Sequence, residues 1–174
     1  MKNLSSYPLL TTWRNHILAC ACLLMPGLAL ALTPGQAVPD FDLQGEPATN
    51  VSLSANKGKV VYLDFWASWC GPCRQSFPWM SEMQAKYGAQ GLVVIAVNLD
   101  ANVAEAKKFL AENPAKFQLA FDTKAQTPKL FGVKGMPTSY LIDRDGKLIF
   151  EHMGFNLSKK DELENAIKKA LDLK

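Results

Sequence analysis

The stretch Asp64–Cys73, with the sequence DFWASWCGPC, joins an apolar run typical of a buried strand to a Cys-x-x-Cys pair. If a helix begins at this pair, the two cysteines lie on one helix face, close enough to form a disulfide. Pro72 between them favours a helix start, because its missing N–H and fixed φ suit the first helical turn. The stretch therefore predicts a strand, a turn and a redox-active pair at the start of a helix.

This pattern places Cys70 at the N-terminal end of the helix. There the unpaired backbone N–H groups and the positive end of the helix dipole favour a thiolate over a thiol. Cys-x-x-Cys pairs lower a thiol pKa from about 8.5 to about 7 or below, and the thiolate is the species that attacks disulfides. We expect Cys70 to be exposed and Cys73, inside the first turn, to be shielded. Cys70 is thus predicted to be the nucleophile and Cys73 the resolving thiol.

The first 31 residues contain no Asp or Glu, carry basic residues early and then become apolar. The apolar run 17–32 is shorter than the roughly 20 residues that span a bilayer. Ala29-Leu30-Ala31 matches a small-x-small cleavage site. We expect residues 1–31 to be a signal peptide that directs the protein to the periplasm. The alternative is an uncleaved anchor that holds it at the inner membrane.

The remaining residues 32–174 have a length that suits one domain. They are close to electrically neutral once Lys2 and Arg14 are removed, which argues against binding to nucleic acid. Cleavage also removes two of the four cysteines and leaves Cys70 and Cys73. A disulfide between residues so close in sequence constrains little of the unfolded chain, so a purely structural role explains it poorly.

Strand and helix patterns alternate along residues 32–174 and predict an α/β fold with a mixed sheet and helices on both faces. The near-continuous apolar run at 91–98 predicts a strand that pairs beside the one at 59–66. The closing helix is expected to begin with a capping box of Ser158 and Asp161. The predicted strands are 41–43, 51–53, 59–66, 91–98, 117–121, 139–142 and 148–152, and the other predicted helices are 72–87, 102–113 and 128–131.

Residues 65–73 (FWASWCGPC), Pro78 and Met136-Pro137-Thr138 together resemble the thioredoxin superfamily, over about residues 38–172. The long segment before the motif, the strand and helix near 102–121 and the export signal are similar to its exported TlpA, ResA and DsbE group. The resemblance implies a thioredoxin-like three-layer sandwich with a mixed central sheet. It also implies an N-terminal strand extension and a strand-helix insertion.

The resemblance further implies where substrate binds. Pro137 is implied to be cis and to pack beside the cysteines, and the backbone of Met136 to pair with an extended substrate strand. Trp69 adjoins the nucleophile, and its amphipathic ring suits a docking surface. The implied substrate-binding residues are Trp69, Gly71, Pro72, Met136, Pro137 and Thr138.

Two positions depart from the pattern of the exported group. Many exported relatives carry Asn where Asp64 stands and Glu where Ser76 stands, whereas thioredoxins proper carry a buried acid at the first position. We expect Asp64, desolvated beneath the site, to take the proton from Cys73 when Cys73 attacks the mixed disulfide. The missing Glu argues against a strict role in haem-protein maturation.

The predicted function is that of an exported thiol-disulfide oxidoreductase, a reductase of protein disulfides in cytochrome c maturation or cell redox homeostasis. We expect a monomer that binds neither a metal nor an organic cofactor. Zinc usually takes four ligands, and residues 32–174 offer only His152 beyond the two thiols. A reductase in an oxidising compartment also needs a source of electrons, and the resemblance implies a membrane donor of the DsbD/CcdA type.

The same residues leave two other functions open. A disulfide-forming oxidase on the same fold is the first alternative, and a copper or haem chaperone that uses the two thiolates is the second. Arg74 stands where covalent haem attachment requires His. Ala67 and Leu63 stand where a peroxide-reducing relative of this fold carries Thr or Ser and Pro. Covalent haem attachment is thereby excluded and peroxidase activity disfavoured.

Overall fold

The computed structural model describes residues 32–47 and 49–172. The predicted signal peptide or anchor at 1–31 lies outside these residues, and no helix within them is long and apolar enough to cross a lipid bilayer. The elements in chain order are β1 (Asp42–Glu46), β2 (Asn50–Ser52), η1 (Ser54–Asn56), β3 (Val60–Trp66), α1 (Gly71–Tyr87), η2 (Gly88–Gln90), β4 (Leu92–Asn98), α2 (Val103–Glu112), β5 (Gln118–Phe121), α3 (Thr127–Phe131), β6 (Thr138–Ile142), β7 (Leu148–Met153), η3 (Leu157–Lys159) and α4 (Lys160–Asp172).

The strands form one sheet in the order β2-β1-β5-β4-β3-β6-β7. At its centre, β3 pairs in parallel with β4 and antiparallel with β6. The N-terminal hairpin of β1 and β2 joins the far edge, where β1 pairs antiparallel with β5. The predicted mixed sheet and its N-terminal strand extension are confirmed, and β6 pairs antiparallel with β7.

The central strand β3 is buried along its whole length. Its sequence VVYLDFW is rich in β-branched and aromatic residues, which favour strands. Successive side chains point to opposite faces of a sheet. Tyr62 and Trp66 accordingly belong to one core cluster, and Leu63 and Phe65 belong to another. Asp64 therefore faces the same side as Tyr62 and Trp66.

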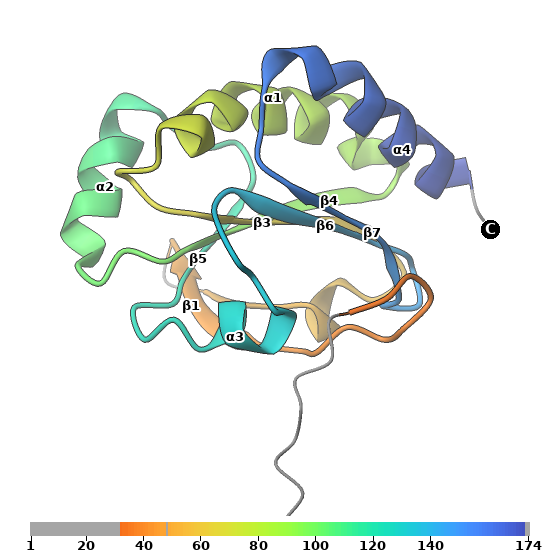
Figure 1. Cartoon of the computed structure of the whole chain (residues 1–174), viewed down its shortest axis with the longest axis horizontal. Coiled ribbons are helices and arrows are strands. Elements are labelled where there is room, and N and C mark those ends of the chain that lie inside the picture. Colours follow the sequence, from red (N-terminus) through yellow and green to blue (C-terminus); the bar gives the residue numbers. More distant parts are fainter. Residues whose placement is uncertain (1–31, 48, 173–174) are drawn as a thin grey trace, which may run out of the picture.

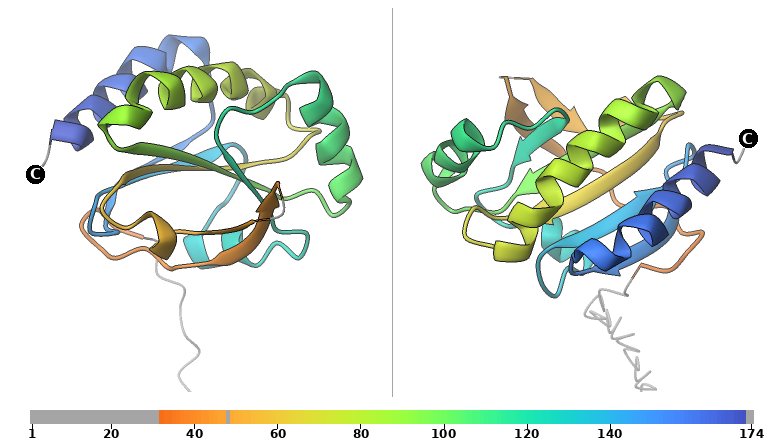
Figure 2. Two further views of the ribbon diagram at one scale, coloured as in Figure 1. Left: turned by 180° about the vertical axis from the view of Figure 1, so that it is seen from behind. Right: turned by 90° about the horizontal axis from the view of Figure 1, so that it is seen from above.

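Helices cover both faces of the sheet and complete the predicted three layers (Figure 1). α1 and α4 lie side by side across one face, as the view from above shows (Figure 2). α2, part of the predicted strand-helix insertion, lies beyond α1 toward one edge and packs Phe109 against Phe77 of α1 at 5.0 Å between ring centroids. α3 lies on the opposite face, where Phe131 packs against Phe65.

One predicted local feature is wrong. Ser158 and Asp161 form no capping box, because α4 begins only at Lys160, after the 3-10 turn η3 that contains Ser158. The Ser158 hydroxyl instead donates to Oδ1 of Asn156 at 2.5 Å. The 3-10 turn thus shifts the helix start two residues beyond the point that the pattern indicated.

Candidate active site

The cysteine pair forms a disulfide at the N-terminal end of α1, with Cys70 and Cys73 Cα atoms 5.3 Å apart. Cys70 is the N-cap residue, and its sulfur accepts a hydrogen bond from the Cys73 N–H at 3.3 Å. Pro72 occupies the first turn, as predicted, and this turn contains no acidic side chain. Backbone N–H groups and the helix dipole therefore act on the Cys70 sulfur without a local negative charge from the same turn.

The Cys70 sulfur is more enclosed than the sequence indicated. Cys73 is fully buried, as expected, but Cys70 is only 5% exposed, so the expectation of an exposed Cys70 is wrong for this disulfide form. The reason is that the Cys70 side chain turns back over the helix start toward Cys73. Of the two cysteines, only Cys70 retains contact with solvent, and the predicted order of attack stays a prediction.

Asp64 lies in the centre of β3 and is 2% exposed. Its Oδ2 atom has no hydrogen-bond partner among the described residues. Burial raises the pKa of Asp64 well above its usual range. The side chain faces the layer of α1, because its neighbours Tyr62 and Trp66 on the same strand face share a core cluster with Cys70 and Cys73. A protonatable group therefore lies on the cysteine side of the sheet.

The surroundings of Asp64 include polar groups that the sequence patterns did not reveal. The Tyr62 hydroxyl donates to Oγ of Ser139 at 2.8 Å, and Ser139 is the direct strand partner of Asp64 on β6. The indole N–H groups of Trp66 and Trp79 are buried without a partner among the described residues. Only the pairing of β3 with β6 and the packing of α1 bring these residues together.

The Met136–Pro137 peptide bond is cis, as the resemblance implied. The loop is held from both sides: Thr138 Oγ1 donates to the Gly135 carbonyl at 2.7 Å, and Gly154 N–H donates to the Pro137 carbonyl at 2.7 Å. Thr138 is fully buried, so its side chain supports the loop from inside. Met136 is half-buried and packs against the core cluster that contains both cysteines.

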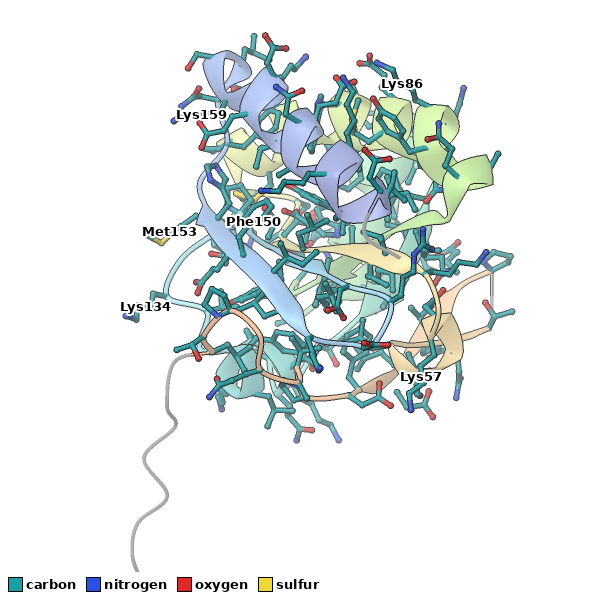
Figure 3. The ribbon with its side chains drawn as sticks, turned by 90° about the vertical axis from the view of Figure 1, so that its right-hand side faces the viewer. Lys57, Lys86, Lys134, Phe150, Met153 and Lys159 are labelled. Carbon is teal, nitrogen blue, oxygen red and sulfur yellow. A yellow bond between two sulfur atoms is a disulfide. The ribbon has the colours of Figure 1, made fainter. Side chains whose placement is uncertain are left out.

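Two exposed apolar side chains belong to segments around the cysteine pair. One directly precedes Cys70, and the other lies on β7 beside the cis-proline loop. Trp69, directly before Cys70, is 72% exposed, and Gly71 and Pro72 are also exposed. Met153 is 64% exposed at the end of β7, where it pairs with Thr138, and its side chain points outward on the same side as Lys134 (Figure 3). These residues give the site a partly apolar rim.

Hollows near the site are small. A shallow cleft of about 260 Å³ next to the segment that precedes Cys70 is lined by Ser68, Trp69, Arg74, Glu105, Lys108, Phe109 and Glu112. Larger hollows of about 400 and 770 Å³ lie along α1 and the β1–β2 hairpin, and none of their lining residues is a cysteine. Among the described residues, no three His, Cys, Asp or Glu side chains gather as a metal site would require. The exposed rim therefore suits a macromolecular substrate better than an enclosed small molecule.

Comparison with known proteins agrees with this geometry. A profile of the Redoxin family matches residues 33–167. The thiol-disulfide oxidoreductase ResA of Bacillus thuringiensis is 38% identical over 138 residues, which cover 78% of this chain and 77% of the relative. ResA of Bacillus subtilis is 31% identical over 119 residues, covering 68% of this chain and 66% of the relative.

Solved structures show the same likeness. A Chlorobium tepidum protein described as a thiol:disulfide interchange protein DsbE has a TM-score of 0.79 and 60% identity, covering 81% of this chain and 99% of that one. The exposed lipoprotein thioredoxin of Streptococcus pneumoniae has a TM-score of 0.67 and 33% identity, covering 75% of this chain and 99% of that one.

Proposed function

Because the chain belongs to the Redoxin family and is a ResA-like thiol-disulfide oxidoreductase of the thioredoxin superfamily, we propose that Cys70 and Cys73 are its catalytic pair. The observation that carries this proposal is the disulfide at the N-terminal end of α1. The substrates are protein disulfides, and the pair cycles between dithiol and disulfide.

Reduction of a substrate proceeds in two exchanges. The Cys70 thiolate attacks one sulfur of the substrate disulfide, forms a mixed disulfide and releases the other substrate sulfur as a thiolate. The Cys73 thiolate then attacks the Cys70 sulfur, forms the Cys70–Cys73 disulfide and releases the second substrate thiolate. Two electrons pass from the protein to the substrate, and each released thiolate takes up a proton.

Asp64 is proposed to accept the proton that Cys73 loses before its attack. Cys73 has no exposed surface through which water could take this proton. A carboxyl whose pKa is raised by burial accepts a proton more readily than a carboxyl in water, which suits it to this role. Ser76, at the position of the Glu in many exported relatives, cannot serve, because a neutral hydroxyl is a much weaker base than a carboxylate; it donates instead to the Cys73 carbonyl at 2.8 Å.

The substrate is proposed to lie across the cis-proline loop and Trp69. The backbone beside Pro137 offers edge groups to an extended strand, the mode of recognition called β-augmentation. Trp69, Gly71 and Pro72 are exposed next to the nucleophile and Met136 is half-buried, so they can contact a polypeptide. Thr138 contributes from beneath, by holding the loop at the Gly135 carbonyl.

The proposed setting is the periplasm, with residues 1–31 as a signal peptide or membrane anchor. The composition of that segment supports export, and the similar pneumococcal protein is an exposed lipoprotein. The proposed direction is reduction, with a membrane donor of the DsbD/CcdA type supplying electrons to a monomer. The reduction potential of the Cys70–Cys73 pair, measured against glutathione, is then expected to be about −270 mV. An oxidase would have a potential of about −120 mV.

The decisive experiment replaces Cys73 by Ala in the full chain, expressed in its own host. We expect mixed disulfides that join Cys70 to partner proteins, separable on non-reducing gels and identifiable by mass spectrometry. The matched control is the double variant Cys70→Ala, Cys73→Ala, which should trap nothing. Full turnover of Cys73→Ala without trapped partners would refute the proposed order of attack.

A further inference from the structure

A buried carboxylate holds the turn that precedes the nucleophile. Asp100 follows β4 and is 4% exposed. Its Oδ2 atom accepts hydrogen bonds from Ser68 N–H at 2.9 Å and from Asn98 Nδ2 at 2.8 Å. Its Oδ1 atom accepts one from Ser68 Oγ at 3.1 Å. Two of the three contacts therefore fall on Ser68, two residues before Cys70.

The segment Ala67–Cys70 is a tight turn between β3 and α1. Cys70 N–H donates to the Ala67 carbonyl at 3.1 Å, and Leu99 N–H donates to the Trp66 carbonyl at 2.9 Å. Cα atoms two residues apart are at most about 7 Å from each other. A displacement of Ser68 therefore carries directly to Cys70, and also to Trp69, whose side chain is mostly exposed.

We propose that Asp100 is a positioning residue for thiol-disulfide exchange, which holds the Ala67–Cys70 turn so that Cys70 stays at the N-terminal end of α1 and Trp69 faces the substrate. This inference rests on the proposed role of Cys70 as the nucleophile and extends it to a residue 30 positions away in sequence. Asp100 acts through Ser68 and takes no part in the exchange itself.

The chemistry of the contacts explains why an acid stands here. A carboxylate accepts several hydrogen bonds at once, and here it satisfies a backbone N–H, a hydroxyl and an amide. None of the salt bridges among the described residues involves Asp100. Burying a carboxylate without a cation is costly unless donors surround it. That cost is offset here by donors that belong to the active-site turn and to the strand beside it.

The same contacts predict which substitution preserves the turn. In Asp100→Asn, the amide oxygen can take the place of Oδ2 and accept from Ser68 N–H and Asn98. The amide nitrogen can take the place of Oδ1 and donate to Ser68 Oγ, because a hydroxyl also accepts hydrogen bonds. Asp100→Ala removes all three contacts, and Ser68→Ala removes only the hydroxyl contact.

Asp122 offers a matched control. It follows β5, is also 4% exposed, and accepts from Thr127 N–H at 2.7 Å and Thr127 Oγ1 at 2.5 Å. The two acids thus share burial, position at a strand end and type of contact. Thr127, however, begins α3 on the opposite face of the sheet from α1. Loss of Asp122 should weaken the fold without moving the cysteine turn.

The test compares Asp100→Ala, Asp100→Asn, Ser68→Ala and Asp122→Ala in the full chain, by insulin reduction and by redox equilibrium with glutathione. For Asp100→Ala we expect kcat/KM to fall about tenfold, because small displacements of a reacting group are costly. We expect its equilibrium to shift about tenfold toward the dithiol, equivalent to about 30 mV, because a loosened turn no longer holds the sulfurs ready to join. Ser68→Ala keeps the backbone contact. It should lower kcat/KM and shift the redox equilibrium toward the dithiol, each by about twofold to threefold.

Asp100→Asn and Asp122→Ala should remain within about twofold of the parent protein in both measurements, although Asp122→Ala lowers the melting temperature. Redox values for Asp100→Ala and Ser68→Ala equal to those of Asp122→Ala would overturn the inference, since Asp100 would then serve the fold alone. A loss in Asp100→Asn as large as in Asp100→Ala would overturn it too. Trapping by Cys73→Ala tests the role of Cys70 as the nucleophile separately. A failure of the proposal for Asp100 can therefore be told apart from a failure of the proposal for Cys70.

Discussion

The two faces of the central sheet are built from alternate residues of the same strands, yet their polarity differs. On the α3 face, Val61, Leu63 and Phe65 pack into a cluster of apolar and aromatic side chains. On the α1 face, Tyr62, Asp64 and Trp66 bring a hydroxyl, a carboxyl and an indole N–H into the interior.

The two faces differ in whether their buried polar groups have hydrogen-bond partners. On the α3 face, the Tyr140 hydroxyl donates to the Phe131 carbonyl at 2.9 Å. On the α1 face, Asp64 Oδ2 and the indole nitrogens of Trp66 and Trp79 have no partner among the described residues. Buried polar groups without partners cost free energy. This cost falls on the face that carries the cysteines, so we expect the α3 face to serve stability alone and the α1 face to serve the proposed chemistry as well.

The largest effect is expected at the reactive thiol. Cys70→Ser should lower kcat/KM for insulin reduction by about 10³-fold or more, because a hydroxyl is not ionised at neutral pH and does not exchange with disulfides. The disulfide closes a very short loop, so unfolding in denaturant should change little. Retained activity in Cys70→Ser, with activity lost in Cys73→Ser, would exchange the two assigned roles.

A matched pair of core substitutions tests the separation of the faces. Phe131→Ala on the α3 face and Phe77→Ala on the α1 face should each lower the free energy of unfolding by about 3–5 kcal/mol. Phe131 is 1% and Phe77 is 3% exposed, and each packs against three other aromatic rings. Only Phe77→Ala should change the reduction potential, because Phe77 lies one helical turn after Cys73. Equal shifts in both variants would contradict the separation.

Asp64→Asn should stabilise the protein at alkaline pH. Burial raises the pKa of Asp64 in the folded state, so the fold keeps its full stability below the unfolded-state pKa and loses stability as pH rises through the folded-state pKa. Denaturant unfolding at pH 8 should show the variant more stable by about 1–3 kcal/mol, with the difference vanishing near pH 4.

The same variant should slow the resolving step and change its pH dependence between pH 6 and 9, because Cys73 must then lose its proton to solvent; the measurement is rapid-mixing decay of a mixed disulfide on Cys70. A resolving step with the same rate and the same pH dependence as in the parent protein would refute the proton-accepting role of Asp64. Unchanged stability would show that its carboxyl is solvated in the folded state.

The smallest effect is expected where a polar group of the α1 side is fully partnered. Glu164 is held by Lys86 at 2.6 Å, by the Tyr87 hydroxyl and by Lys168 at 3.4 Å. These contacts lower the pKa of Glu164 to about 2. This stabilisation is present above the unfolded-state pKa and lost as pH falls toward 2. Glu164→Gln should therefore cost about 1 kcal/mol at pH 7, discounted for solvent screening, and less at acid pH. A changed reduction potential would be unexpected.

Local patterns were enough to predict most of the fold. The apolar runs at 59–66 and 91–98 became β3 and β4, and the strand patterns at 139–142 and 148–152 became β6 and β7, because each depends on residues close in sequence. The capping box at Ser158, by contrast, did not form. A 3-10 turn before α4 takes up the same residues, and the capping-box pattern does not distinguish this turn from the first turn of an α-helix.

The residues of the candidate site also fall into two groups: those that a local motif indicates and those that only tertiary contacts bring to the site. Cys70, Cys73 and Trp69 could be selected because their motif is contiguous, and Pro137 because its tripeptide resembles a known loop. Tyr62, Ser139, Trp79 and Asp100 gave no such signal. Their importance arises only from β3 pairing with β6, from α1 packing over the sheet and from the end of β4 meeting the turn before Cys70.

By itself, the sequence determined that a strand passes through Asp64 into a Cys-x-x-Cys pair at a helix start, because strand propensity, Pro72 and the cysteine spacing act within ten neighbouring residues. Only the tertiary structure decided how exposed Cys70 is, which groups surround Asp64 and what holds the turn at Ser68. These properties depend on contacts between residues tens of positions apart, and a linear pattern carries no record of which distant strands become neighbours.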